Sequence, residues 1–162
     1  MSNDTQVNQY VELTQEGLEE LKAELAELTT NRLPRIVERV AEARDKGDLS
    51  ENADYQSARD EQSFIQAKIE EIEEVIARAK IVKATSNHDK VGMGSVVSVQ
   101  IKGKTAKTFT YHIVGEFESE PEEGKVSSVS PMGKALMGKK KGDEVVVEAP
   151  AGEVVYVIKD IK

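Results

Sequence analysis

The sequence of 162 residues contains no cysteine, no tryptophan and only two histidines. Without cysteine, a disulfide framework and a thiolate metal site are both excluded. No stretch approaches the roughly 20 apolar residues that cross a bilayer. The N-terminus also lacks the basic and apolar regions of a signal peptide. We therefore expect a soluble, cytoplasmic protein that does not associate with a membrane.

Motifs that carry chemistry are also scarce in the C-terminal half. It contains no nucleophile motif, no phosphate-binding loop and no paired acid–base site. Neither His88 nor His112 has metal-ligating residues around it, and the lysines at 139–141 are typical of a solvated turn. We therefore do not expect this half to be an enzyme in its own right.

Charge is distributed unevenly along the chain, whose net charge is −8. Residues 1–80 carry 19 acidic and 10 basic side chains, whereas residues 81–162 carry 11 and 12. An overall acidic excess argues against wrapping duplex nucleic acid, where neutralisation of phosphates dominates affinity. It leaves room for one short basic patch, which comprises Arg32, Arg35, Arg39, Arg44, Lys46 and Arg59.

Two apolar series with helical spacing flank a polar run, GDLSENADY, at residues 47–55. The first series is Leu18, Leu21, Leu25, Leu33, Ile36 and Val40; the second is Ala58, Gln62, Ile65, Ile69, Ile72, Ile76 and Ala79. If the chain reverses near Leu49, Val40 meets Ala58 and the other positions pair outward in the same register. The pattern predicts an antiparallel helical hairpin, a coiled coil, whose tip carries acids at intervals of three: Asp45, Asp48, Glu51 and Asp54.

The expected helix limits come from capping signals. Thr14 is suited to the N-cap of the first helix, and the second helix is expected from about Ser50 to Lys80. Pro34 lies inside the first arm, where it removes a backbone hydrogen bond, so we expect a kink near residues 29–34.

Beyond a linker at 83–93, the apolar pattern changes from helical to alternating. Strands are expected at 95–101, 108–114, 126–130, 144–148 and 154–161. Ser130 and Pro131 provide an N-cap and an N1 proline for a short helix. The expected fold class is α+β, with a coiled coil at 1–82 and a small antiparallel sheet domain at 94–162.

Three segments resemble the Gre family of bacterial transcript-cleavage factors, most closely its A-type members. They are the tip GDLSENADY with EAR before it and SARDEQ after it, the proline-interrupted first arm, and VSSVSPMGKALMGKKKGDEVVV. The resemblance extends from Thr14 to Ile161. It implies a C-terminal domain of FK506-binding-protein-like fold that docks at the rim of the RNA polymerase secondary channel. It also implies a coiled coil that enters this channel and stimulates the polymerase's intrinsic endonucleolytic cleavage of backtracked, arrested nascent RNA.

The resemblance assigns the tip chemistry to Asp48 and Glu51. Two-metal hydrolysis of a phosphodiester needs a positioned second cation and an activated water. Two carboxylates offer Mg²⁺ only part of an octahedral shell, so we expect no stable binding by this chain alone, only a Mg²⁺ shared with polymerase carboxylates. The spacing alone fits another interpretation, a capping box with Asp48 as the N-cap and Glu51 at N3.

The resemblance also suggests roles for other residues. Arg44 and Arg59 are expected to contact the RNA 3′ end or the polymerase channel; surface ion pairs with glutamates are the alternative. Leu49 and Tyr55 are expected to pack the tip. The docking residues suggested are Ser130, Pro131 and Met132. We expect a monomer that is an activator and not an enzyme.

Two other functions stay open at this point. A prolyl isomerase is suggested by the expected fold, but a fold does not determine function. The aromatic lining of such a pocket has only Phe109, Tyr111, Phe117 and Tyr156 to draw on. The other possibility is a pure binding module, either a channel occupant that does not promote cleavage or a coiled-coil adaptor.

Overall fold

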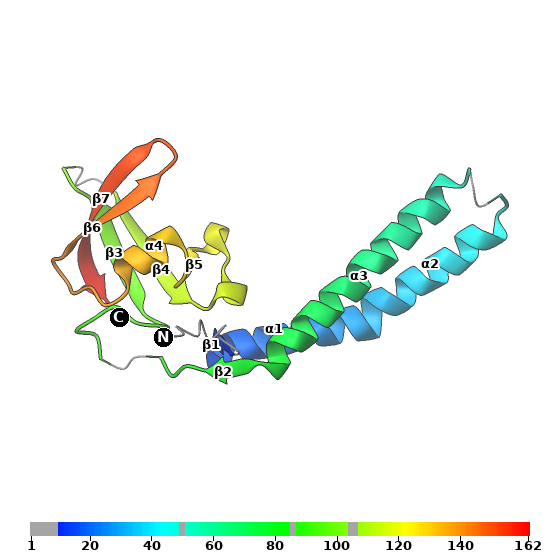
Figure 1. Ribbon diagram of the computed structural model, residues 1–162, viewed down its shortest axis with the longest axis horizontal. Coiled ribbons are helices and arrows are strands. Elements are labelled where there is room, and N and C mark those ends of the chain that lie inside the picture. Colours follow the sequence, from blue (N-terminus) through cyan, green and yellow to red (C-terminus); the bar gives the residue numbers. More distant parts are fainter. Residues whose placement is uncertain (1–9, 49–50, 85–86, 104–106) are drawn as a thin grey trace, which may run out of the picture. The chain divides into compact units, whose positions relative to one another are not determined.

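The computed structural model describes residues 10–48, 51–84, 87–103 and 107–162. The chain separates into two compact units (Figure 1). One is Leu18–Arg78, and the other joins the N-terminal segment up to Gly17 with Ala79–Lys162. The domain limits expected at residues 82 and 93 stay a prediction. No helix within the described ranges is both long enough and apolar enough to span a bilayer.

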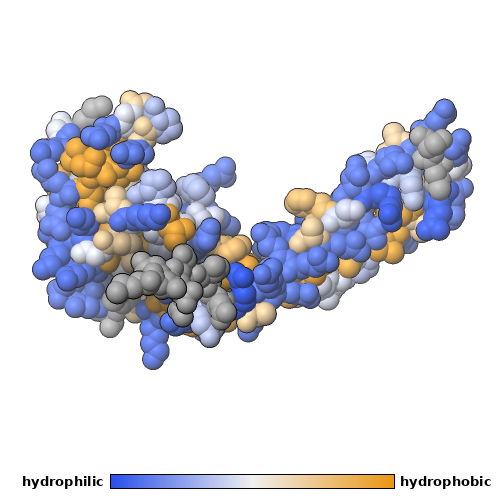
Figure 2. Space-filling view, viewed as in Figure 1, coloured by the Kyte–Doolittle hydropathy of each residue, from blue (hydrophilic) through white to orange (hydrophobic). Residues whose placement is uncertain are grey.

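The predicted helical hairpin is confirmed. Its segments are α1 (Gln15–Glu27), the π-helical turn η1 (Leu28–Arg32), α2 (Leu33–Asp45) and α3 (Ala53–Ala77). Burying one apolar stripe on each arm stabilises the pair, and the surface left outside is mainly hydrophilic (Figure 2). The buried side chains are Leu21, Leu28, Ile36, Val40, Ala43, Ala58, Ile65, Ile69, Ile72 and Val75.

The irregularity expected before Pro34 takes the form of η1. In this π-helical turn the Leu33 N–H donates to the Leu28 carbonyl, five residues back. Proline has no N–H and its ring crowds the preceding turn, so a wider turn relieves the conflict. The hydroxyl of Thr29 donates to the Leu25 carbonyl at 2.8 Å and that of Thr30 to the Ala26 carbonyl at 2.6 Å, which satisfies acceptors near the interruption.

The second helix ends earlier than expected. α3 stops at Ala77, and Ala79–Ile81 form strand β2, which pairs in parallel with β1 (Val11–Leu13). The Val82 N–H continues the ladder by donating to the Leu13 carbonyl at 2.9 Å, and the Leu13 side chain is fully buried. This pairing joins segments almost 70 residues apart, so the local apolar pattern that favoured a helix gave no sign of it.

The second unit is built on a sheet with the strand order β5-β4-β3-β7-β6. The strands are β3 (Val96–Ile101), β4 (Thr108–Val114), β5 (Lys125–Ser127), β6 (Glu144–Ala149) and β7 (Gly152–Ile161). The expected antiparallel sheet is confirmed, with one exception: β4 and β5 run parallel. The connection between β4 and β5 contains two short 3₁₀ turns, η2 (Glu116–Glu118) and η3 (Pro121–Glu123). It brings the chain back to the start of the pairing, so that β5 runs parallel to β4.

A short helix, α4 (Pro131–Leu136), packs against the core of this unit and contributes Leu136 to it. Its expected N-cap, Ser130, is confirmed. The Ser130 hydroxyl accepts from the Gly133 N–H at 3.0 Å and donates to the Ser127 carbonyl at 2.7 Å. A Cβ at Gly133 would overlap that same carbonyl, so glycine permits the close approach of helix and strand. The core cluster is Val91, Val97, Val99, Ile113, Leu136, Val145, Ile158 and Ile161.

One carboxylate of this unit is buried. Glu118 is 8% exposed, and its Oε2 accepts from the Thr14 N–H at 3.0 Å and the Gly115 N–H at 2.9 Å. Its Oε1 accepts from the Thr14 hydroxyl, which itself accepts from the Gly17 N–H at 3.0 Å and so caps α1 as predicted. Glu118 therefore supports the first turn of α1 and the first turn of η2 together.

Candidate functional site

The turn between α2 and α3 begins where α2 is closed off by local geometry. The Lys46 N–H donates to the Ala43 carbonyl at 3.3 Å, in the tighter pattern common at helix ends. Gly47 follows with φ 140°, a backbone conformation that other residues rarely adopt. The helix therefore stops here and the chain is free to reverse. Leu49, expected to pack the tip, lies outside the described residues.

Asn52, and not Asp48, is the N-cap of α3. Its Oδ1 accepts from the Tyr55 N–H at 3.1 Å, and its Nδ2 donates to the Ala43 carbonyl at 2.7 Å. The capping-box interpretation of Asp48 and Glu51 is therefore wrong. Asparagine caps as well as aspartate does, and it can also donate, which a carboxylate cannot. Sequence reasoning missed Asn52 because Asp48 and Glu51 fitted a familiar pattern.

Asp48 and Glu51 are both exposed side chains at this turn. Carboxylate oxygens are the ligands that Mg²⁺ prefers, and the ion is usually held by one or two of them with the remaining positions filled by water or phosphate. In the described part of the chain, no three histidine, cysteine or acidic side chains gather as a metal site. Two exposed carboxylates are a donor type that suits Mg²⁺, and they are fewer than a complete shell requires.

The neighbouring acid Asp54 is engaged elsewhere. Arg39 donates to its Oδ1 at 2.8 Å and to Glu61 Oε2 at 3.1 Å, and so links α2 to α3 just behind the turn. The hydrogen bond from Arg39 lowers the pKa of Asp54, and the same contact raises the pKa of Arg39. Asp54 therefore serves the hairpin, while Asp45 at the end of α2 is exposed.

Arg44 and Arg59 differ from Arg39. Both are exposed, one in the last turn of α2 and the other on α3. Among the described residues, neither guanidinium lies within 4.0 Å of a carboxylate, whereas Arg39 pairs with two. The ion-pair alternative that the sequence left open is not favoured by this geometry. The two positive charges remain available to a phosphate or to an acidic surface.

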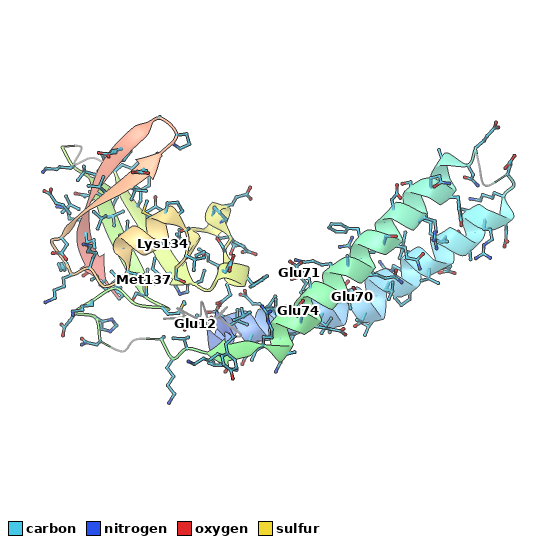
Figure 3. All side chains as sticks on the ribbon, in the orientation of Figure 1. Glu12, Glu70, Glu71, Glu74, Lys134 and Met137 are labelled. Carbon is cyan, nitrogen blue, oxygen red and sulfur yellow. The ribbon has the colours of Figure 1, made fainter. Side chains whose placement is uncertain are left out.

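Acidic charge is not confined to the turn. Glu70, Glu71 and Glu74 project from the half of α3 that is remote from it (Figure 3). Glu71 pairs with Lys68 at 3.3 Å and Glu74 with Arg78 at 3.2 Å, which are ordinary surface contacts within one helix. Negative charge alone therefore does not distinguish the turn. What distinguishes it is that a neutral residue caps the helix while the acids stay exposed.

The residues suggested for docking lie at the start of α4 and differ in exposure. Pro131 is exposed, whereas Ser130 is half-buried and Met132 packs on the core cluster. Exposed apolar side chains stand on either side of them: Val129 is 50% exposed and Met137 is 37% exposed. The sequence does not predict that Val129 and Met137 are exposed, because an apolar residue beside a short helix can equally well be buried.

Three aromatic residues of the sheet pack together. The rings of Phe109 and Tyr111 lie 6.4 Å apart and nearly parallel, and Tyr156 meets Phe109 edge-on at 6.4 Å. All three are partly buried against the core cluster, and burial is the main reason that the pKa of Tyr111 is raised. These side chains are engaged in packing. Phe117, in η2, is 40% exposed.

The two halves of the sequence match two families. Residues 11–81 match the family described as transcription elongation factor, N-terminal, and residues 86–162 match transcription elongation factor, GreA/GreB, C-term. The transcription elongation factor GreA of Amoebophilus asiaticus is 43% identical over 149 residues, which cover 91% of this chain and 94% of that protein. The GreA of Acidiphilium cryptum is 45% identical over 147 residues, 90% of this chain and 93% of that protein.

Solved structures with a similar chain are also found. One is GreA factor homolog 1 (Gfh1) of Thermus thermophilus, with a TM-score of 0.44 and 27% identity, covering 94% of this chain and 99% of that one. Another is a prokaryotic transcription elongation factor GreA/GreB from Nitrosomonas europaea, with a TM-score of 0.43 and 20% identity, covering 94% of this chain and 98% of that one.

Proposed function

Because the chain belongs to the GreA/GreB family of transcription elongation factors, we propose that it binds RNA polymerase and stimulates the polymerase's own cleavage of nascent RNA in backtracked complexes. The observation that carries this proposal is the division of roles at the turn. Neutral Asn52 caps α3, and Asp48 and Glu51 are left exposed. The N-cap position of α3 is therefore filled by a residue other than these acids.

The contribution of this chain to the chemistry is a pair of carboxylates. Asp48 and Glu51 would hold part of the shell of a Mg²⁺ shared with the polymerase and would orient a water for attack on the RNA phosphate. When bound, such an ion stabilises negative charge and lowers the pKa of its water. Neither carboxylate has to be consumed in the reaction, so the chain acts as an activator of the polymerase.

The arginines near the turn would serve binding. Exposed guanidinium groups suit phosphate oxygens, and Arg44 and Arg59 carry no ion pair among the described residues. They would hold the 3′ end of the RNA or the wall of the channel while the carboxylates are presented. The docking contact is assigned to Ser130, Pro131 and Met132, and the factor is proposed to act as a monomer.

A cleavage assay tests the proposal directly. An elongation complex is stalled in a backtracked state with RNA labelled at the 5′ end, and cleavage is timed with and without the protein. We expect the labelled RNA to shorten faster as 3′ fragments are released, in proportion to occupancy. Protein that binds the complex but leaves cleavage unchanged at saturation would overturn the proposal and favour the channel occupant.

A further inference from the structure

We propose that Asn52 is a positioning residue that ties the end of α2 to the start of α3 and so fixes where Asp48 and Glu51 are presented. The inference rests on the proposed function of those two acids. One amide group makes both links: its Nδ2 donates to the Ala43 carbonyl at 2.7 Å and its Oδ1 accepts from the Tyr55 N–H at 3.1 Å.

Each link is made to a backbone group at a helix end. The last carbonyls of α2 and the first N–H groups of α3 have no partner within their own helix. Tyr55 supplies one of those N–H groups. The Ala43 carbonyl accepts from the Lys46 N–H at 3.3 Å and takes Asn52 Nδ2 as a second donor, at the shorter distance of 2.7 Å. A carboxylate or a serine hydroxyl at this position would cap α3 equally well. A carboxylate, however, cannot donate to Ala43. A serine oxygen would lie nearer the backbone than the amide nitrogen does, so we expect it to keep the bond to Tyr55 and to lose the one to Ala43. Capping alone therefore does not explain the amide.

The packing and ion pairs near Asn52 also hold the ends of α2 and α3 together. Ala43 and Ala58 are both fully buried, and small side chains at these last core positions allow the two backbones to come close. One turn behind, Arg39 joins Asp54 and Glu61 across the same pair of helices. Among the described residues, Arg39 and Asn52 therefore both link α2 to α3, and Asn52 does so at the ends of the segment that carries the acids.

Losing the hydrogen bond from Asn52 to Ala43 should make the positions of Asp48 and Glu51 less well defined. It should leave the fold intact. Without the bond to Ala43, the end of α2 and the side chains that follow it should sample more positions, so Asp48 should be presented less consistently. A partner that orients metal ligands typically contributes about 10-fold in affinity or activity. We therefore expect the Mg²⁺ concentration for half-maximal stimulation of cleavage to rise by about that factor.

Two substitutions separate the tie from the cap. Asn52→Asp keeps the acceptor for Tyr55 and loses the donor to Ala43, while Asn52→Ser keeps a capping oxygen and adds no charge. Asn31→Ser is the matched control, because Asn31 is an exposed asparagine on the same arm whose amide reaches only Glu27. Full-length variants are compared for thermal unfolding, for polymerase binding in competition with the native protein, and for cleavage against Mg²⁺ concentration.

The expected result is a higher Mg²⁺ requirement in both Asn52 variants, with native polymerase binding and native unfolding, and no change in Asn31→Ser. A shift in Asn52→Asp alone would be an effect of its added charge and would overturn the proposal. Mg²⁺ curves of both variants that superimpose on the native curve would overturn it as well.

Amide hydrogen exchange in the free protein provides a readout that needs no polymerase. Backbone amides at 43–48 should exchange faster in both Asn52 variants, while the Tyr55 amide stays protected in Asn52→Asp. Unchanged exchange at 43–48 contradicts the tie. If the native protein fails to stimulate cleavage, the proposed function fails by itself, and the exchange data still decide whether Asn52 links the two helix ends.

Discussion

The first turns of α1 and α3 both need hydrogen-bond acceptors for backbone N–H groups. A buried carboxylate takes part at α1, and a neutral amide does so at α3. At α1 the buried carboxylate of Glu118 takes three hydrogen bonds, from the N–H and hydroxyl of Thr14 and from the Gly115 N–H. At α3 the helix start is held by the neutral amide of Asn52, and the acids Asp48 and Glu51 are exposed. Both sites place acidic side chains near the positive end of a helix dipole.

The two helix starts differ in whether the acid is buried within the fold. A carboxylate that serves folding is worth burying only when donors surround it, because an unpaired buried charge is costly. Glu118 meets that condition. Asp48 and Glu51 stay at the surface, where a charge costs little and can meet a ligand from outside. This contrast makes specific predictions. Removing the charge of the exposed acids should lower activity and leave stability almost unchanged, whereas displacing the buried carboxylate of Glu118 should lower stability.

The largest expected effect is on activity at the α3 start. Asp48→Asn and Glu51→Gln keep the size and polarity of the side chains and remove the charges. Stimulated cleavage should fall by about 100-fold. Losing a residue that only orients a metal ligand costs up to about that factor, and losing the ligand itself should cost at least as much. The free energy of unfolding should change by less than about 0.5 kcal/mol, as is usual for surface positions. Cleavage rates and thermal unfolding of the same preparations measure both.

Excess Mg²⁺ and competition supply the controls for these two variants. Higher Mg²⁺ or higher pH should restore part of the rate, since each supplies metal or hydroxide that the carboxylates no longer help to gather. Each variant at saturation should also displace the native protein and act as an inert occupant. Full activity in both variants would falsify the assignment of Asp48 and Glu51 as metal-holding acids. The difference in function from Glu118 would then no longer stand.

The second effect is on stability at the α1 start. Gly17→Ala would normally stabilise a helix, because alanine has the higher helix propensity. Here the new Cβ would overlap the carboxylate of Glu118. Displacing a buried carboxylate from its donors should cost about 2–3 kcal/mol, the range of overpacking and lost charged hydrogen bonds. Chemical denaturation of the full chain measures the loss.

A double-mutant cycle separates this clash from other effects of alanine. Glu118→Ala removes the side chain that the new Cβ would meet. In that background Gly17→Ala should be neutral or mildly stabilising, so the two substitutions should be strongly non-additive. Equal costs in both backgrounds would mean that Glu118 is not what requires glycine at position 17.

The sequence predicted the parts of these two sites that are local. Thr14 and Ser130 were recognised as N-caps because a cap and the N–H it accepts from lie three residues apart. The hairpin followed from two apolar series that pair in one register. The capping-box interpretation failed because Asp48 and Asn52 are equally good caps in isolation. The choice between them depends on the bond from Asn52 to Ala43, on the other helix.

Non-local pairing accounts for the other differences. Strand β2 and the parallel alignment of β5 depend on partners at Val11–Leu13 and in β4 that no local pattern reveals. Glu118 likewise gave no signal in the sequence, because its donors at Thr14 are 104 residues away. The roles of Asp48, Glu51, Arg44 and Arg59 stay predictions that only assays with polymerase can test.

A third effect, of several-fold, concerns the arginines near the turn. Arg44→Ala with Arg59→Ala should reduce cleavage at low protein concentration and much less at saturation, because binding is weakened and the chemistry is not. Losing a phosphate contact should also lower the salt slope of binding by about 1 per contact. The matched control is Arg39→Ala, whose charge is already neutralised by Asp54 and Glu61. An unchanged concentration dependence in the double variant would contradict a role of these arginines in binding.

The smallest effect is a pH dependence behind the turn. The hydrogen bond from Arg39 lowers the pKa of Asp54, so folding favours its ionised form. Its contribution to hairpin stability is therefore complete above the unfolded pKa of about 3.9 and is lost as the pH falls through the lower folded value. Native protein should be slightly more stable than Asp54→Asn near neutral pH, and this difference should vanish in acid and shrink with added salt. Far-UV circular dichroism during thermal unfolding measures it. In an Arg39→Gln background the Asp54→Asn difference should be small at every pH; a difference that persists there would assign the effect to the helix dipole of α3 instead of Arg39.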